Sequence, residues 1–103
     1  MKRGEVRWYK FHTPDKKRPV VILSRNSVIE YLAEVTVAPV TATIRDIPSE
    51  VILTGEDGVS KDCAVNCDHL QTVARSKLGA LITILSTERM IQVSKAVRFA
   101  LDA

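Results

Sequence analysis

The chain has 103 residues, of which 15 are Lys or Arg and 12 are Asp or Glu, and its formal net charge is +3. This length holds one compact domain and hardly two, and a hydrophobic fraction of 46% supports a modest core and excludes a disordered tail. We therefore expect a single domain over residues 1–103. No apolar stretch reaches the roughly 18–20 residues that cross a bilayer, and no signal-peptide core follows the basic N-terminus, which predicts a cytoplasmic protein without membrane contact.

The charge is distributed unevenly along the chain. Residues 1–26 hold eight basic and two acidic side chains, whereas residues 27–103 hold seven basic and ten acidic ones. A positive end on an otherwise acidic chain indicates a face that meets an anion. Partners that carry phosphate groups are the first candidates.

The first third of the chain predicts two strands joined by a short loop. Residues 4–11 alternate between apolar and charged side chains, as in a half-buried strand whose Trp8 points to the core, and residues 12–17 form a loop around Pro14. Residues 19–24 are an apolar, β-branched run that predicts a strand covered on both faces. A polar break at 26–27 leads into 28–32, which is either a loop or a short helical turn.

The middle of the chain predicts more short strands. Residues 33–44 read as a strand in which Pro39 indicates an edge position or a bulge. Residues 51–53 and 63–67 flank a hairpin signal at 55–58. A further strand is expected at 68–73, a short helical turn at 74–78 and the last strand at 80–85.

The end of the chain changes to a helical period over residues 87–101. Met90, Ile91, Val97 and Leu101 are expected along its buried face, with Val93 at the margin, and Ser86 or Thr87 can cap its start. Many short strands followed by one helix predict a mainly β fold, a small barrel or strongly curled sheet closed by a C-terminal helix.

The two cysteines are expected to be buried core thiols. On one strand, Cys63 and Cys67 would lie about 13 Å apart, at roughly 3.3 Å per residue, which is too far for a disulfide. With only two histidines in the chain, the thiols make a poor zinc set, and we expect neither a metal nor a cofactor.

The basic run Lys16, Lys17 and Arg18 stands directly before the second strand. It is either a solvated loop or an anion site. In the second case Pro19 and the stiff strand behind it would position the Arg18 guanidinium, whose planar fork suits a phosphodiester, while the lysines add attraction. Phe11 and Tyr9, next to this loop, are candidates to stack on a base.

Other candidate ligands lie at strand ends. Thr41 and Thr43 would face the same side of one strand, where they either simply favour the strand or bind a ribose or phosphate oxygen. Arg25, Asn26 and Arg45 end adjacent strands, and loops at such ends often form a binding face.

Several segments together resemble the MazF/PemK (Kid) family of bacterial toxins from toxin–antitoxin pairs. They are residues 2–6 (KRGEV), 17–24 (KRPVVILS), 38–44 (APVTATI), 47–51 (IPSEV), 68–73 (DHLQTV) and the closing amphipathic helix. The resemblance covers nearly the whole chain and rests on the order and spacing of these segments.

The resemblance implies an SH3-like (CcdB/MazF-type) barrel that forms a homodimer. It also implies metal-independent cleavage of single-stranded RNA to 2′,3′-cyclic phosphate and 5′-hydroxyl ends, and neutralisation by a cognate antitoxin. The family's key arginine precedes the proline of the second strand, here Arg18, and its key threonine lies on the next long strand, here Thr41. Lys16, Lys17, Arg25, Asn26, Thr43 and Arg45 are the expected RNA-binding residues.

The loop at 12–17 departs from the family because it is short, rich in lysine and without glycine. His12 in this loop is a candidate acid or base. Two alternatives remain open: a non-enzymatic toxin that poisons DNA gyrase, as CcdB toxins do, and a nucleic-acid-binding module without catalysis. Only the endoribonuclease requires the pair of Arg18 and Thr41.

Overall fold

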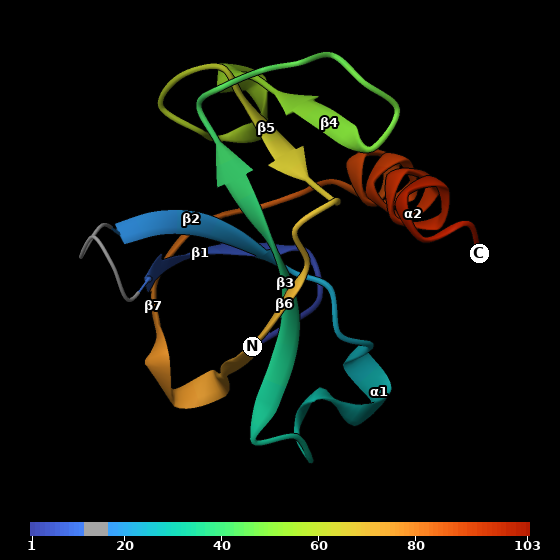
Figure 1. Cartoon of the computed structure of the whole chain (residues 1–103). Coiled ribbons are helices and arrows are strands. Elements are labelled where there is room, and N and C mark those ends of the chain that lie inside the picture. The colour runs from blue at the N-terminus through green and yellow to red at the C-terminus, as the bar shows by residue number, and fades with distance from the viewer. Residues whose placement is uncertain (12–16) are drawn as a thin grey trace.

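The computed structural model of the chain describes residues 1–11 and 17–103, so that His12 and Lys16 lie outside the described residues. The elements in this part are β1 (Glu5–Lys10), β2 (Lys17–Ile22), α1 (Asn26–Ile29), β3 (Glu34–Thr41), β4 (Glu50–Leu53), β5 (Cys63–Asn66), β6 (Gln71–Ala74), β7 (Leu78–Ile84) and α2 (Thr87–Leu101), with 3-10 turns η1 (Gly55–Asp57) and η2 (Arg75–Lys77) (Figure 1). The predicted mainly β fold with a C-terminal helix is confirmed. No helix in the described part is long and apolar enough to cross a membrane.

The strands form one antiparallel, strongly curled sheet around the long strand β3. The strand order is β4-β5-β3-β2-β1-β7, and β6 pairs with β3 beside β5. β3 pairs along one side with β2, and along its other side first with β6 (Glu34 to Val37) and then with β5 (Val40 and Thr41). The expectation that Pro39 lies on an edge strand is therefore wrong. Pro39 lies where β3 changes partner, so its missing N–H falls at a break in the ladder.

Two apolar clusters lie on opposite faces of β2 and β3. Val21 belongs to the cluster under α2, with Val40, Leu53 and Val65, whereas Val20 and Ile22 belong to the second cluster, with Val35, Val37 and Val73. Alternate residues of a strand point to opposite faces, so an uninterrupted apolar run fills both clusters. The prediction that this strand is covered on both faces is confirmed.

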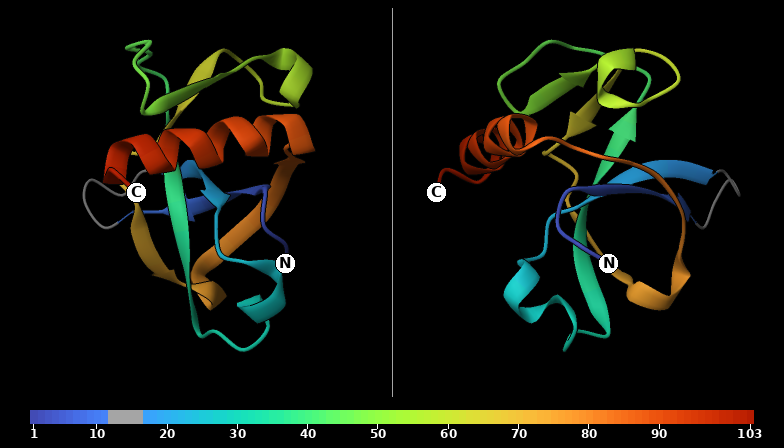
Figure 2. Two further views of the ribbon diagram at one scale, coloured as in Figure 1. Left: turned by 90° about the vertical axis from the view of Figure 1, so that its right-hand side faces the viewer. Right: turned by 180° about the vertical axis from the view of Figure 1, so that it is seen from behind.

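The C-terminal helix lies across the sheet, next to the β4–β5 hairpin (Figure 2). Its predicted bounds are confirmed, and the Ser86 hydroxyl accepts a hydrogen bond from the Arg89 N–H at 3.1 Å, as an N-cap does. The predicted buried face is only partly confirmed. Met90 and Val97 pack against the core cluster, but Val93 and Ala96 are the buried residues, and Ile91 and Leu101 are more than half exposed. The helix approaches β4 through its smaller side chains, which leaves larger apolar groups on the outer surface.

Four further expectations need correction. Trp8 is 40% exposed and not in the core. Residues 26–27 begin α1, and the strand expected at 68–73 begins only at Gln71. The strand expected at 33–44 ends at Thr41, because the chain then turns into the loop that leads to β4.

Candidate functional site

Two adjoining hollows meet at Arg18 and Thr41, which line both of them. The first, which we call the Trp8 hollow, has a volume of about 240 Å³ and is also lined by Trp8, Pro19, Val40, Ala42, Val59, Ser60, Lys61, Cys63 and Ile82. The second, the His69 hollow, has a volume of about 340 Å³ and is also lined by Phe11, Pro39, Val40, Arg45, Asn66, His69 and Gln71.

The pairing of β2 with β3 explains why Arg18 and Thr41 lie together. The two strands are antiparallel, and Val20 pairs with Pro39. The same register continued by two residues sets Arg18 opposite Thr41, at the start of one strand and the end of the other. Tyr9 of β1 pairs with Arg18 from the other side. A flexible basic side chain is thus attached to a backbone that is paired with β1 and lies beside the end of β3.

Arg45 is held at the mouth of the His69 hollow by a buried carboxylate. The side chain of Glu50 is fully buried, and its Oε2 lies 3.0 Å from Nε of Arg45. The backbone N–H of Arg45 donates to Oε1 of the same carboxylate at 2.9 Å. One carboxylate therefore fixes both the loop after β3 and the direction of its arginine, whose side chain is half exposed.

The turn between β5 and β6 adds Asn66 and His69 to this site. Asn66 is buried, and its Oδ1 accepts the N–H of Asp68 at 3.0 Å. Its Nδ2 lies 3.3 Å from Nδ1 of the exposed His69. Neither residue is among the predicted ligands, because only strand pairing brings them to the site. β5 and β6 both pair with β3, so the turn that connects them lies beside the end of that strand.

Several predicted ligands are not brought together with these residues. Arg25 follows Arg18 by seven residues, or up to roughly 20 Å along an extended chain, and it lines a separate hollow with Arg3. Asn26 accepts the backbone N–H of Arg3 at 2.7 Å. Because adjacent antiparallel strands run in opposite directions, the C-terminal ends of β2 and β3 lie at opposite ends of the pair. The expectation that Arg25 and Asn26 lie beside Arg45 is therefore wrong.

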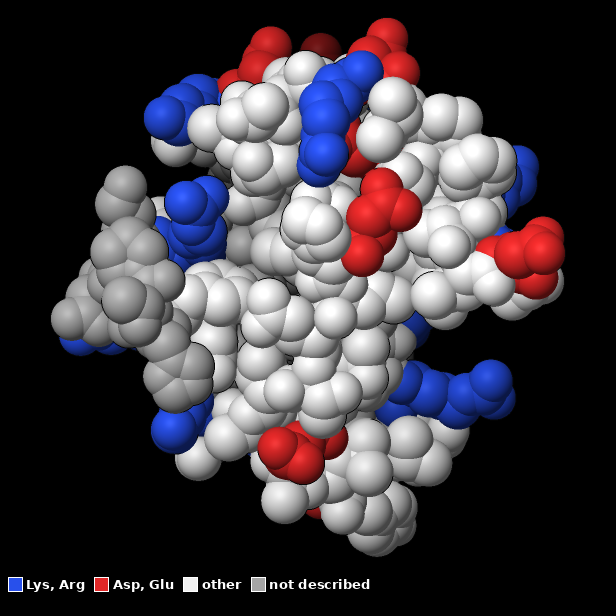
Figure 3. Space-filling model, in the orientation of Figure 1, with Lys and Arg blue, Asp and Glu red and all other residues white. Residues whose placement is uncertain are grey.

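Thr43 does not share a strand face with Thr41, since β3 has ended. Instead the Thr41 hydroxyl accepts the backbone N–H of Thr43 at 3.1 Å. This bond orients the Thr41 oxygen without using the proton of the hydroxyl. Lys17 is exposed at the first residue of β2. On the face seen in Figure 3, Lys and Arg side chains lie in separate patches among uncharged and acidic side chains.

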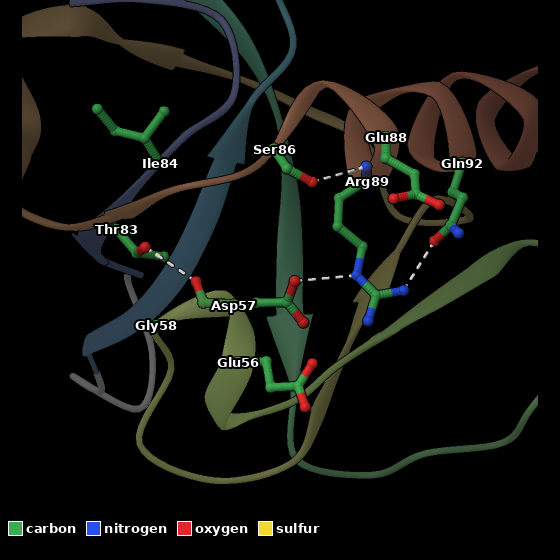
Figure 4. Close-up of a pocket in the computed structure, with 9 residues that line it drawn as sticks. All are labelled: Glu56, Asp57, Gly58, Thr83, Ile84, Ser86, Glu88, Arg89 and Gln92. Atoms are coloured by element: carbon green, nitrogen blue, oxygen red, sulfur yellow. Dashed lines mark hydrogen bonds and ion pairs between the residues drawn. The ribbon is translucent and has the colours of Figure 1, made fainter.

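A larger cavity of about 510 Å³ lies between η1 and the start of α2, away from Arg18 (Figure 4). Here Nε of Arg89 lies 2.9 Å from Oδ1 of Asp57, and the Thr83 hydroxyl donates to the Asp57 carbonyl oxygen at 2.9 Å. Burial raises the pKa of Asp57, but the hydrogen bond and charge of Arg89 outweigh it and hold this pKa below its ordinary value. The contacts join the hairpin to the helix, which is a structural role.

Neither cysteine is a nucleophile. Both are free and buried, which confirms the expectation of core thiols. Burial, with the charge of Asp68 and Glu50, raises the pKa of Cys67 to about 11, and burial also raises the pKa of Cys63. Thiols with such values carry little thiolate at neutral pH. Within residues 1–11 and 17–103, no group of three or more His, Cys, Asp or Glu side chains is arranged to hold a metal ion.

Known proteins share both the sequence and the fold. The family model described as PemK-like, MazF-like toxin of type II toxin–antitoxin system matches residues 2–101. Endoribonuclease MazF3 of Mycobacterium tuberculosis is 38% identical over 88 residues, 85% of this chain and 85% of that protein. The structure of Mycobacterium tuberculosis toxin MazF-mt6 superposes with a TM-score of 0.86 at 34% identity, over 95% of this chain and 96% of that one.

A second solved structure is that of an endoribonuclease in complex with its cognate antitoxin from a mycobacterial species. It superposes with a TM-score of 0.87 at 25% identity, over 99% of this chain and 95% of that one. The similarity thus extends through all the strands that form the two hollows and through α2. Because the family model matches nearly the whole length of the chain, the chain belongs to the PemK-like, MazF-like toxins of type II toxin–antitoxin systems.

Proposed function

We propose that the chain is an endoribonuclease toxin that cleaves single-stranded cytoplasmic RNA, without a metal ion, where the Trp8 and His69 hollows meet. The observation that carries the proposal is that Arg18 and Thr41 together line both hollows. The name of the M. tuberculosis relative, Endoribonuclease MazF3, supports the same activity.

The proposed reaction is an internal transesterification. The 2′-oxygen of a ribose attacks the neighbouring phosphorus, and the bond from phosphorus to the 5′-oxygen breaks. The 2′-hydroxyl loses a proton and the leaving 5′-oxygen gains one, which yields a 2′,3′-cyclic phosphate and a 5′-hydroxyl. The intermediate phosphorane carries additional negative charge, so it is stabilised by donors that are positioned before the reaction starts.

Arg18 and Thr41 are the proposed catalytic residues. The guanidinium of Arg18 donates two parallel hydrogen bonds to phosphate oxygens and offsets the developing charge. The Thr41 hydroxyl, whose oxygen is already oriented by the Thr43 N–H, donates its own proton to the same phosphate. Arg45 and Lys17 attract the flanking phosphates. Lys16 and the candidate acid or base His12, which lie outside the described residues, are proposed from the sequence alone.

The test is cleavage of RNA by purified protein in EDTA. We expect defined fragments with cyclic phosphate at one end and, at the other, a 5′-hydroxyl that polynucleotide kinase labels without prior phosphatase treatment. Arg18→Ala should lower the rate by roughly 100- to 1000-fold, the usual cost of one positioned donor. Arg98→Ala, which removes the same charge from an exposed position on α2, is the matched control.

The competing interpretation is a toxin that poisons DNA gyrase without cutting RNA. If wild-type protein with a native circular dichroism spectrum cuts no RNA, the endoribonuclease proposal fails and this interpretation gains. If Arg18→Ala remains folded and cuts at the wild-type rate, the activity stands but the assignment of Arg18 is wrong.

We also propose that the toxin acts as a homodimer and is neutralised by a cognate antitoxin. The structurally similar mycobacterial endoribonuclease was solved in complex with its cognate antitoxin, which supports such a partner here. An acidic segment that orders on the basic face would compete with RNA for Arg18 and Arg45. Light scattering tests the dimer, and release of RNA on addition of the antitoxin tests the competition.

A further inference from the structure

The contact between Asn66 and His69 defines where the His69 imidazole carries its proton. Asn66 Oδ1 accepts the backbone N–H of Asp68 at 3.0 Å, so the amide nitrogen is the atom that faces the ring. That nitrogen, Nδ2, lies 3.3 Å from His69 Nδ1. An amide nitrogen only donates hydrogen bonds, so Nδ1 accepts, and the proton of the imidazole lies on Nε2.

The orientation of Asn66 is itself held by its surroundings. Its side chain lies among the buried residues at the end of β5, and Asn66 pairs with Glu50 of β4. Turning the amide by 180° would set its NH₂ group against the N–H of Asp68 and break the hydrogen bond between them, which is costly for the buried Asn66 side chain. His69 therefore presents a fixed N–H donor, Nε2–H, from an exposed ring at the His69 hollow.

Phe11 adds an aromatic ring to the lining of the same hollow. The ring of Phe11 meets the ring of Tyr9 edge to face, with 4.9 Å between the centroids and an interplanar angle of 78°. Both rings pack against the second apolar cluster, which restricts their movement. An aromatic side chain gains little from a phosphate, but it stacks well on an unpaired base.

The hollow thus separates two kinds of binding group. Arg18 and Arg45 are cationic and suit phosphates, whereas Phe11 offers an apolar surface and His69 an N–H donor. The side chain of Gln71, whose backbone pairs with Val37 next to the break at Pro39, adds an amide at the same rim. Single-stranded RNA presents this combination of a charged backbone and bases with planar apolar faces.

We propose that the His69 hollow binds the nucleobase next to the cleaved phosphate, with the base against Phe11 and the Nε2–H of His69 donating to a ring nitrogen or carbonyl oxygen of that base. This inference rests on the proposed function for its substrate. A base that presents an amino group at this point would set two donors against each other, so His69 discriminates between bases. His69 is a specificity-determining residue and not the acid or base of the reaction.

The tautomer is tested by long-range ¹H–¹⁵N correlation spectra of the protein, in which the His69 signals are assigned by their loss in His69→Phe. We expect the pattern of the Nε2–H tautomer. A proton on Nδ1 would overturn the proposal. Short 2′-O-methyl oligonucleotides, which cannot be cut, are then titrated with one base varied at a time, and the Nε2–H signal should shift by an amount that depends on that base. If no oligonucleotide shifts the signal, the proposal is wrong whether or not the protein cuts RNA.

Cleavage supplies the second test. In His69→Phe, which keeps a planar ring without the donor, the ratio of kcat/KM between the preferred RNA and the RNA with that base changed should fall about three- to tenfold, the contribution of one hydrogen bond. His69→Gln, whose amide can donate, should recover part of the ratio. An unchanged ratio in His69→Phe, or an equal loss for every RNA, would assign His69 to structure or to the backbone and refute the proposal.

Discussion

Replacement of Gly58 by alanine is expected to destabilise the hairpin that forms one wall of the Trp8 hollow. Gly58 has a φ of +90°, and a Cβ built on it would lie 2.4 Å from Oγ1 and 2.9 Å from Cβ of Thr83. The left-handed backbone costs alanine about 1–2 kcal/mol. Thr83 must also turn away and lose its bond to the Asp57 carbonyl oxygen, which adds about 1 kcal/mol. We therefore expect Gly58→Ala to lower the free energy of unfolding by about 2–3 kcal/mol.

The contribution of Thr83 can be separated by a double-mutant cycle followed by urea unfolding and circular dichroism. Thr83→Ala alone should cost about 1 kcal/mol, because it removes the hydroxyl bond. In that background Gly58→Ala should cost about 1 kcal/mol less than in the wild type, because the hydrogen bond of the Thr83 hydroxyl is already absent, while Cβ of residue 83 remains in contact. Costs that add to within about 0.3 kcal/mol would refute the argument that Gly58→Ala acts by displacing the Thr83 hydroxyl. The residues after Gly58 line the Trp8 hollow, so loss of RNA cleavage should accompany loss of stability.

Three further outcomes follow from charged and buried groups. Because Arg89 holds the pKa of Asp57 below its ordinary value, the stability that Asp57 contributes is present above about pH 4 and lost as the pH falls below it. Asp57→Asn should therefore lose less stability than the wild type between pH 7 and pH 3, and an equal loss in both proteins by urea unfolding would contradict this. Cys67, with a pKa of about 11, should react with iodoacetamide only in urea, and mass spectrometry of native protein showing rapid alkylation there would disprove its burial as a thiol. Glu50→Ala removes both bonds to Arg45 and should cost about 1.5–3 kcal/mol by urea unfolding and weaken RNA binding in a filter assay; unchanged RNA affinity would show that the position of Arg45 does not matter for binding.

The sequence predicts the elements well wherever local pattern determines burial. The apolar run around Val20 to Ile22 could only be a strand covered on both faces, and the helix at 87–101 has a cap and a period of its own. Local pattern fails where the depth of burial depends on distant partners. Trp8 belongs to an alternating strand but lines a hollow. Ile91 belongs to an amphipathic helix but lies on the outside, because Val93 and Ala96 are the residues of α2 that are buried.

For the candidate site, the sequence predicts the pair of Arg18 and Thr41 through the family resemblance, and strand register accounts for their proximity. It places Arg25 after the strand that Arg18 begins, but it does not predict that Arg25 lies apart from Arg45, because that follows from the antiparallel pairing of β2 with β3. Nor does it predict His69 as part of the site. That residue reaches the hollow only because two separate strands, β5 and β6, pair with successive parts of β3.

The division of β3 between two partners also determines how the fold can open. Val35 and Val37 of this strand belong to one apolar cluster, and Ala38 and Val40 to the other, so neither cluster can come apart while β3 remains in place. Partial unfolding that releases only one half of the sheet would have to disrupt β3, the strand that both halves share. We therefore expect the backbone amides of β3 to exchange their hydrogens with solvent more slowly than those of any other element. Thr41 is the last residue of that strand, so a group proposed for catalysis is anchored to the stability of the whole molecule, while loops around it supply the binding contacts.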